Sequence, residues 1–138
     1  MDIEYSKKLL TIYIENAVRI LQAGFGVNHA QSTFFSIVKL LKENPELKNY
    51  FLEKVSKVMN LNDPGTMDFE LPPEELVELV THEFRWEEMS DLAQQRVDKM
   101  YKGDWSFAVG EISQRILDAQ KDDWPDREFY SYYENPRN

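Results

Sequence analysis

Hydrophobic residues recur at intervals of three and four along nearly the whole chain, and this spacing places them on one face of an α-helix. The first stripe ends at Gly24-Phe25-Gly26, because glycine tolerates the left-handed backbone that closes many helices. No segment convincingly predicts a strand. We therefore expect an all-α protein of about six or seven helices. The first stripe consists of Leu10, Tyr13, Ile14, Ala17, Val18 and Leu21.

Two more stripes follow in the first half of the chain. Asn28 precedes one of them and has Gln31 three residues later, which is the spacing of a reciprocal capping box. Asn44-Pro45 precedes the other and combines a capping side chain with the residue best suited to a first helical position. Pro64-Gly65 marks a turn in the longest irregular connection, about 60–72. The two stripes are Phe34, Ile37, Val38, Leu41 and then Leu47, Phe51, Val55, Val58, Met59.

The second half predicts three further stripes and a short last element. Pro72-Pro73 opens the first of these stripes, and Gly103-Asp104 separates the second from the third. The phase changes near Arg85-Trp86, which leaves open whether the first two stripes form separate helices or one kinked helix. After Trp124-Pro125, three aromatic residues could pack on the bundle. The stripes are Leu76, Leu79, Val80, Phe84; Trp86, Met89, Leu92, Ala93, Val97, Met100; and Trp105, Ala108, Val109, Ile112, Ile116, Ala119, and the late aromatic residues are Phe129, Tyr130 and Tyr133.

The length of 138 residues fits one domain, so we expect a single helical domain over residues 1–138. The connection over 60–72 is too short to force two separate domains. Helices joined by short turns form hairpins, which pack as an irregular bundle or as HEAT-like stacked pairs. The chain shows no repeat of fixed period, and this favours the bundle.

The composition excludes several kinds of chemistry. The chain contains no cysteine, which rules out disulfides, thiolate catalysis, cysteine-based zinc sites and iron–sulfur clusters. The first residues are acidic and no apolar region follows them, so they do not resemble a signal peptide. No apolar stretch approaches the roughly 18 residues of a membrane span. We expect a cytoplasmic protein with no cofactor.

The net charge of −9 is concentrated in the second half of the chain. Residues 71–138 contain 16 acidic and 8 basic side chains, whereas residues 1–70 contain 9 and 8. Such a field repels nucleic acid and anionic lipid and accelerates association with a basic protein. We therefore expect a protein partner with a basic surface, and neither nucleic acid nor membrane. Solubility alone is the competing explanation.

Motifs for catalysis are nearly absent. The chain has no nucleophile elbow and no phosphate-binding glycine loop. Its two histidines are His29 and His82, and Glu78 lies four residues before His82, on the same helical face. Such a pair could ligate a metal or share a proton, but zincin and di-iron motifs both need further residues that are missing here. The favoured explanation is a histidine satisfied structurally by Glu78.

The segment over about 122–138 interleaves acidic residues with aromatic ones. Tryptophan and tyrosine are enriched at the energetic centres of protein interfaces, and flanking carboxylates would select a basic partner. The same aromatic residues could instead close the end of the bundle as a packed cap. A second candidate surface combines a tryptophan with mixed charge. The candidate protein-binding residues are Asp122, Asp123, Trp124, Asp126, Tyr130 and Tyr133 in the first surface and Arg85, Trp86, Glu87 and Glu88 in the second.

In size, acidity, absence of cysteine and helix content, the chain is similar to small acidic bacterial immunity proteins, which neutralise toxic nucleases through carboxylate-rich surfaces. The resemblance includes no motif, and what it implies is an inhibitor-type role. The sequence thus favours a non-catalytic acidic protein-binding module over an enzyme. The alternatives are a small metal-dependent enzyme using Glu78, His82 and nearby carboxylates, or a structural subunit of a larger assembly, which includes a homo-oligomer.

Overall fold

The computed structural model describes residues 2–134, and in that range the chain forms seven α-helices, three short 3-10 helices and no strand. The prediction of an all-α multi-helix bundle is confirmed. None of the described helices is both long and apolar enough to cross a membrane. The α-helices are α1 (Ile3–Gln22), α2 (Val27–Glu43), α3 (Lys48–Met59), α4 (Glu74–Phe84), α5 (Glu87–Tyr101), α6 (Ile112–Ala119) and α7 (Ser131–Glu134), and the 3-10 helices are η1 (Pro45–Leu47), η2 (Trp105–Ala108) and η3 (Pro125–Phe129).

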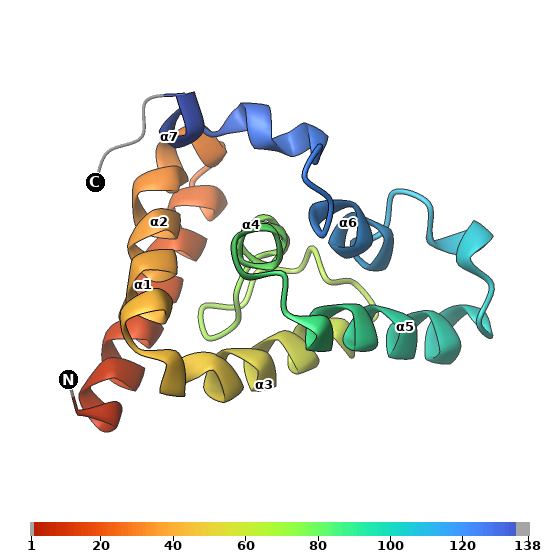
Figure 1. Ribbon diagram of the computed structural model, residues 1–138, viewed down its shortest axis with the longest axis horizontal. Coiled ribbons are helices and arrows are strands. Elements are labelled where there is room, and N and C mark those ends of the chain that lie inside the picture. Colours follow the sequence, from red (N-terminus) through yellow and green to blue (C-terminus); the bar gives the residue numbers. More distant parts are fainter. Residues whose placement is uncertain (1, 135–138) are drawn as a thin grey trace.

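Helix α4 lies in the middle of the bundle (Figure 1). Helices α1 and α2 form a hairpin on one side of it, and α2 packs directly against it. Helix α6 packs on its other side and also contacts α5, which in turn contacts α3. The segment that contains η3 and α7 runs from the end of α6 across to α2. The bundle therefore surrounds one central helix.

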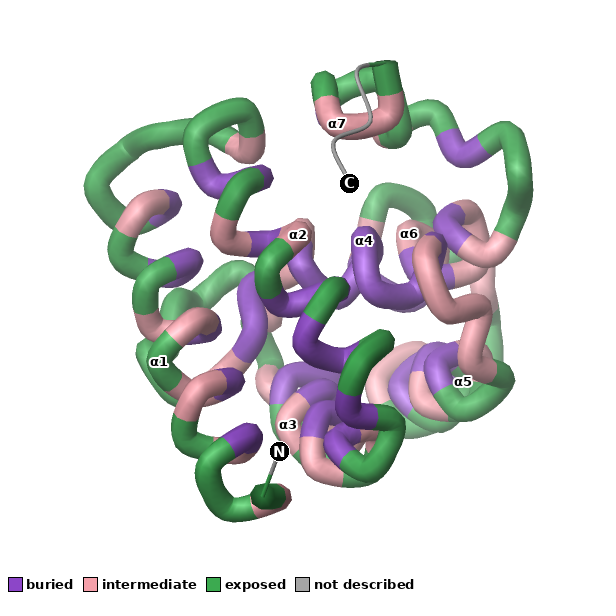
Figure 2. Tube along the Cα trace, turned by 60° about the vertical axis from the view of Figure 1, so that its left-hand side comes forward, coloured by how far each residue is buried: buried purple, intermediate pink, exposed green. Residues whose placement is uncertain are grey.

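The central position of α4 follows from its sequence. Every residue from Leu76 to His82 is buried, so the helix has no solvent face over two turns (Figure 2). A helix that is buried on all sides is normally apolar all round. Here Glu78, Thr81 and His82 interrupt the apolar surface, and buried polar groups need hydrogen-bond partners. The surrounding elements have to supply those partners.

Helices α4 and α5 are separate, which answers the question that the phase change near Arg85 left open. Arg85 adopts the left-handed conformation, with φ 53°, and its backbone N–H donates to the carbonyl of Thr81. This conformation costs a non-glycine residue roughly 1–2 kcal/mol. The Arg85 side chain offsets that cost through hydrogen bonds to the carbonyls of His82 and Gln120.

Asn44 and Pro45 begin a helical element, η1, as predicted, but the side-chain caps predicted for the second and third helices do not form. Helix α2 begins at Val27, one residue before Asn28, and no side chain caps it. Gln31 instead donates to the hydroxyl of Ser131, 2.9 Å away, and so contacts the C-terminal segment. The Asn44 side chain donates to the carbonyl of Leu40, and its oxygen accepts from Ser6 and from no backbone N–H of the following turn. The amide of Gln31 thus contacts a residue far along the chain, and the amide of Asn44 contacts the last turn of α2.

The stripe from Trp105 to Ala119 predicts one helix, but the structure divides it into η2 and α6. Gly110 between them has φ 78°, which is the left-handed region where glycine is favoured. Because the chain turns there, Val109 is 78% exposed and does not belong to the buried stripe. The carboxylate of Glu111 then starts α6 by accepting a hydrogen bond from the backbone N–H of Ser113.

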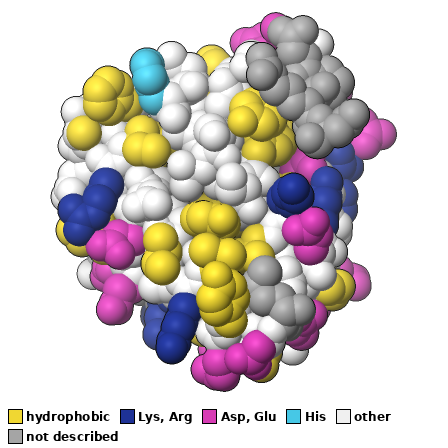
Figure 3. All heavy atoms as spheres, turned by 90° about the vertical axis from the view of Figure 1, so that its left-hand side faces the viewer, with side chains coloured by type: hydrophobic (Ala, Val, Ile, Leu, Met, Phe, Trp, Pro, Cys, Tyr) yellow, Lys and Arg dark blue, Asp and Glu magenta, His cyan; other side chains and the backbone are white. Residues whose placement is uncertain are grey.

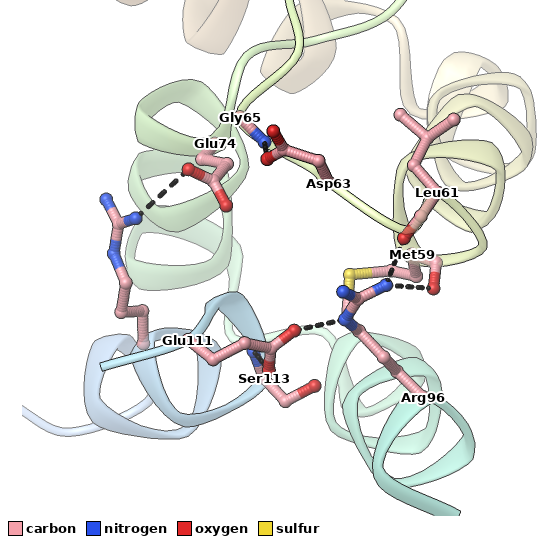
Figure 4. A network of polar contacts seen from close by, with 9 residues as sticks. Met59, Leu61, Asp63, Gly65, Glu74, Arg96, Glu111 and Ser113 are labelled. Carbon is pink, nitrogen blue, oxygen red and sulfur yellow. Dashed lines mark hydrogen bonds and ion pairs between the residues drawn. The ribbon is translucent and has the colours of Figure 1, made fainter. Parts of the chain in front are cut away.

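A buried arginine joins three elements below α4 (Figure 4). Arg96 on α5 donates to the carbonyls of Met59, at 2.8 Å, and Leu61, at 2.7 Å, where α3 ends. It also forms an ion pair with Glu111 at the start of α6. The Arg96 side chain is only 1% exposed, so water cannot replace these partners.

Replacing Arg96 by methionine should therefore be costly. We expect Arg96→Met to lower the free energy of unfolding by about 3 kcal/mol, because it leaves two carbonyls and the Glu111 carboxylate without their donor. Urea denaturation checks this value. The matched control is Arg19→Met, which removes an exposed pair with Glu15 and should cost less than about 1 kcal/mol. Equal losses in the two variants would contradict the role of Arg96.

Candidate functional site

The C-terminal segment, residues 122–134, closes one side of the bundle through its aromatic residues. Trp124 and Tyr130 are buried, and their ring centroids lie 6.1 Å apart. Trp124 lies against His82 of α4, with ring centroids 4.7 Å apart, and Tyr130 contacts Phe34 and Phe35 of α2. These two predicted interface residues therefore pack within the fold, and most of the exposed surface of the segment comes from its other residues.

His82 holds this segment through polar contacts. Its Nδ1 donates to the carbonyl of Ala119 at 2.9 Å, because a carbonyl can only accept. Its Nε2 then accepts from Arg127 at 2.8 Å. Burial lowers the pKa of His82, and the guanidinium groups of Arg85 and Arg127 act in the same direction. The ring is therefore neutral and joins α4, α6 and η3.

Arg85 brings the two predicted surfaces together. Its guanidinium forms an ion pair with Asp122 at 3.1 Å, and the Asp122 side chain is otherwise fully exposed. The rest of the second surface lies apart from this contact. Glu87 is exposed, and Glu88 pairs with Lys48 at 3.0 Å. Trp86 is half-buried against Phe84 and Phe51 and stays largely within the fold.

Around the outer side of the segment, carboxylates surround an open hollow of about 410 Å³. We call this feature the acidic hollow. Asp123, Glu128 and Glu134 are exposed in it, as is Asp122. Trp124, Pro125, Arg127 and Tyr133 complete the lining. Residues 135–138 of the predicted segment lie outside the described part of the chain.

Tyr133 and Arg127 form the ordered part of the acidic hollow. The Tyr133 hydroxyl donates to Glu83 at 2.6 Å, and the Arg127 guanidinium lies 3.8 Å from the centre of the Tyr133 ring. Burial acts to raise the pKa of Glu83, but hydrogen bonds from Tyr133 and Lys42 outweigh it and lower the pKa below its ordinary value. Glu83 is therefore ionised and anchors Tyr133.

On the inner side of the same segment lies a second cavity, of about 220 Å³, which we call the Glu78 cavity. Glu78 is 2% exposed, and its Oε2 pairs with Arg115 of α6. Burial raises the pKa of Glu78 to about 7, although the Arg115 guanidinium acts in the opposite direction. The lining consists of Val27, Glu75, Glu78, Arg115, Trp124, Asp126, Phe129 and Tyr130.

Glu78 and His82 do not combine into a metal centre. Residues 2–134 contain no group of three or more histidine, aspartate or glutamate side chains that could hold a metal ion. Glu78 pairs with Arg115, and both nitrogens of His82 contact other groups. The prediction that Glu78 is the hydrogen-bond partner of His82 is wrong. The partners of His82 are the carbonyl of Ala119 and the guanidinium of Arg127.

No sequence pattern indicated that several residues of the site would contact one another. Arg115 and Arg127 each contact a titratable residue of α4, but they lie 37 and 45 residues away from it along the chain. Gln31 supports the segment across 100 residues. Only the alternation of acidic and aromatic residues could have indicated Phe129 and Glu128, which belong to the segment that the sequence singled out.

The face formed by α1 and α2, which adjoins α7 (Figure 1), has a different character. The face formed by α1 and α2 shows basic, acidic and hydrophobic side chains intermixed (Figure 3). This agrees with the near balance of charge in residues 1–70. The acidic surplus belongs to the second half of the chain, where the acidic hollow and the Glu78 cavity lie.

The raised pKa of Glu78 predicts a pH-dependent contribution to stability. An acid whose pKa is about 7 in the folded chain and near 4.5 in the unfolded chain stabilises the fold most below pH 4.5, and it loses this contribution as the pH rises through 7. Glu78→Gln removes the titration. Between about pH 4.5 and pH 8, we expect the unfolding free energy of the wild type to fall by roughly 2–3 kcal/mol relative to that of the variant. Urea denaturation of both proteins across this range measures the difference, and a difference that does not vary with pH would refute the assignment.

No protein-family model, curated protein or solved structure matches the chain. Its function must therefore be inferred from its own surfaces and cavities.

Proposed function

We propose that the chain is a non-catalytic protein-binding module that binds a basic partner through the acidic hollow. The observation that carries this proposal is the grouping of four exposed carboxylates around a concave surface that has aromatic residues in its lining. An inhibitor of the immunity type, which neutralises a basic protein, is the form of such a module that the acidity and size favour.

The charge of the acidic hollow is poorly neutralised by the protein itself. Among the described residues, Asp122 pairs with Arg85, whereas Asp123, Glu128 and Glu134 form no ion pair. Unpaired surface carboxylates attract cations over roughly 10 Å at moderate salt. A basic partner would gain both a faster encounter and contacts that fix its orientation.

Contacts within the chain hold the aromatic and basic lining of the acidic hollow in place. Arg127 lies over the ring of Tyr133, 3.8 Å from its centre. Tyr133 is held by Glu83, and Arg127 is held by His82, so both are ordered without a partner. An ordered surface loses less conformational entropy on binding than a mobile one.

Among residues 2–134, no contact favours the metal-dependent alternative. His82 would have to give up Ala119 or Arg127 to reach a metal, and both contacts hold the C-terminal segment. The alternative of a structural subunit would use exposed apolar side chains such as Phe107 and Val109. These two lie together on the connection between α5 and α6, and they form no concave surface with a charge that would identify a partner.

Neutralising the acidic hollow should weaken the binding of a basic probe. The test variant is Asp122→Asn, Asp123→Asn, Glu128→Gln and Glu134→Gln, and the probe is a synthetic peptide of alternating lysine and arginine. We expect its affinity to fall at least ~10-fold, because each exposed charge contributes roughly 0.2–1 kcal/mol. Calorimetric titration measures the change, and higher salt should reduce the affinity of the wild type.

The control variant removes the same net charge from the first half of the chain. It carries the substitutions Asp2→Asn, Glu43→Gln, Glu46→Gln and Glu53→Gln, all at exposed positions. The peptide should bind this variant nearly as tightly as the wild type. Equal losses in the two variants would show that net charge alone attracts the peptide, and the acidic hollow would then not be the binding site.

A further inference from the structure

The Glu78 cavity is separate from the acidic hollow, and the proposed function does not use it. Of the residues that line the cavity, only Trp124 also lines the acidic hollow. Its volume of about 220 Å³ exceeds the roughly 150 Å³ of a cavity that binds benzene. Glu78 and Tyr130 are buried in its wall, whereas Phe129 is 56% exposed. The cavity therefore runs from solvent to a buried carboxylate.

Only half of the Glu78 carboxylate has a partner. Its Oε2 accepts from Arg115, and Arg115 also donates to Glu74 at 3.3 Å. Its Oε1 is buried and has no hydrogen-bond partner among the described residues. Burying an ionised carboxylate oxygen without a donor is costly, so a positive charge nearby would stabilise the ionised form of Glu78.

The acidic side chains that line the cavity outnumber the basic ones, so the cavity favours a cation. Glu75 and Asp126 lie close enough to Glu78 to raise its pKa further, and a single guanidinium, that of Arg115, faces these three carboxylates. Arg115 is itself shared with Glu74. An added positive charge would reduce the repulsion among the carboxylates, whereas an anion would increase it.

Aromatic rings form much of the remaining wall. Trp124, Phe129 and Tyr130 all line the cavity, and burial raises the pKa of Tyr130, so its hydroxyl stays protonated. The faces of such rings attract ammonium and guanidinium groups, and their hydrocarbon surface accepts an alkyl chain. A buried carboxylate beside several aromatic rings is a combination suited to organic cations.

We propose that the Glu78 cavity binds an alkylammonium or alkylguanidinium group, whose charged end lies beside the Glu75, Glu78 and Asp126 carboxylates and whose alkyl part packs against Trp124, Phe129 and Tyr130. This site goes beyond the proposed function. The Glu78 cavity would bind a single cationic group, whereas the acidic hollow would bind a basic protein surface. The group can belong to a free amine or to a lysine or arginine side chain of a protein.

The test uses calorimetry with n-butylammonium as the probe and n-butanol as its neutral counterpart. We expect n-butylammonium to bind and n-butanol to bind at least ~10-fold more weakly. Glu78→Gln should reduce the binding of n-butylammonium by a similar factor, and Glu53→Gln, at an exposed position on α3, should not change it. Phe129→Ala provides a second variant: because Phe129 is 56% exposed, its removal should cost little stability, and it should weaken the binding of n-butylammonium by removing one aromatic wall.

Two further measurements make the test specific. Affinity should rise from pH 6 to pH 8 as Glu78 loses its proton, with Arg115, Glu75, Asp126 and Tyr130 as the other titratable groups that face it. A short peptide with one lysine between glycines distinguishes the two sources. Binding of the peptide as tight as that of n-butylammonium assigns the site to a protein side chain, and much weaker binding assigns it to a free amine.

Three results would overturn the proposal. They are no binding of n-butylammonium to the wild-type chain, equal binding of n-butanol, and unchanged binding of n-butylammonium to Glu78→Gln. None of them depends on the four carboxylates tested in the acidic hollow, so failure here leaves the proposed function in place. Conversely, loss of peptide binding to the acidic hollow does not affect the result for n-butylammonium.

Discussion

The structure depends on how two titratable side chains in the buried part of α4 are satisfied. Helix α4 has no solvent face between Leu76 and His82, yet it carries Glu78 and His82 there. Burying such groups is tolerated only when donors and acceptors surround them. Arg115 from α6 pairs with one oxygen of Glu78, and Arg127 from η3 donates to His82, so the contact with Arg127 helps to hold the C-terminal segment across α4.

The same arrangement explains why the molecule has two acidic features. The C-terminal segment has an inner side that faces α4 and an outer side that faces solvent. Its inner side, with Trp124, Asp126 and Tyr130, encloses the Glu78 cavity, and its outer side, with Glu128 and Glu134, borders the acidic hollow. Acidic residues in this one segment thus take part in a cavity with an incompletely neutralised carboxylate and in an open surface that attracts cations.

Much of the fold could be predicted from the sequence, because helical stripes depend on local spacing. The stripes of α1 to α5 contain most of the buried residues, such as Ile14, Phe34 and Phe51. The stripe after Trp105 failed because apolar spacing continued across Gly110, whose backbone turns the chain. The sequence also placed Trp124 and Tyr130 together but left open whether they pack or bind. Their burial depends on Phe34, Phe35 and His82, which are far away along the chain, and the pairing of Glu78 with Arg115 leaves no local pattern at all.

The position of the closing segment has a consequence for biosynthesis. A nascent chain leaves the ribosome with its N-terminus first. The helices around α4 therefore emerge before Trp124 and Tyr130. Until those rings arrive, the nascent bundle exposes the apolar wall of α4 and lets water reach its carboxylate and imidazole. The core around α4 is therefore completed only after residues 122–134 have been synthesised.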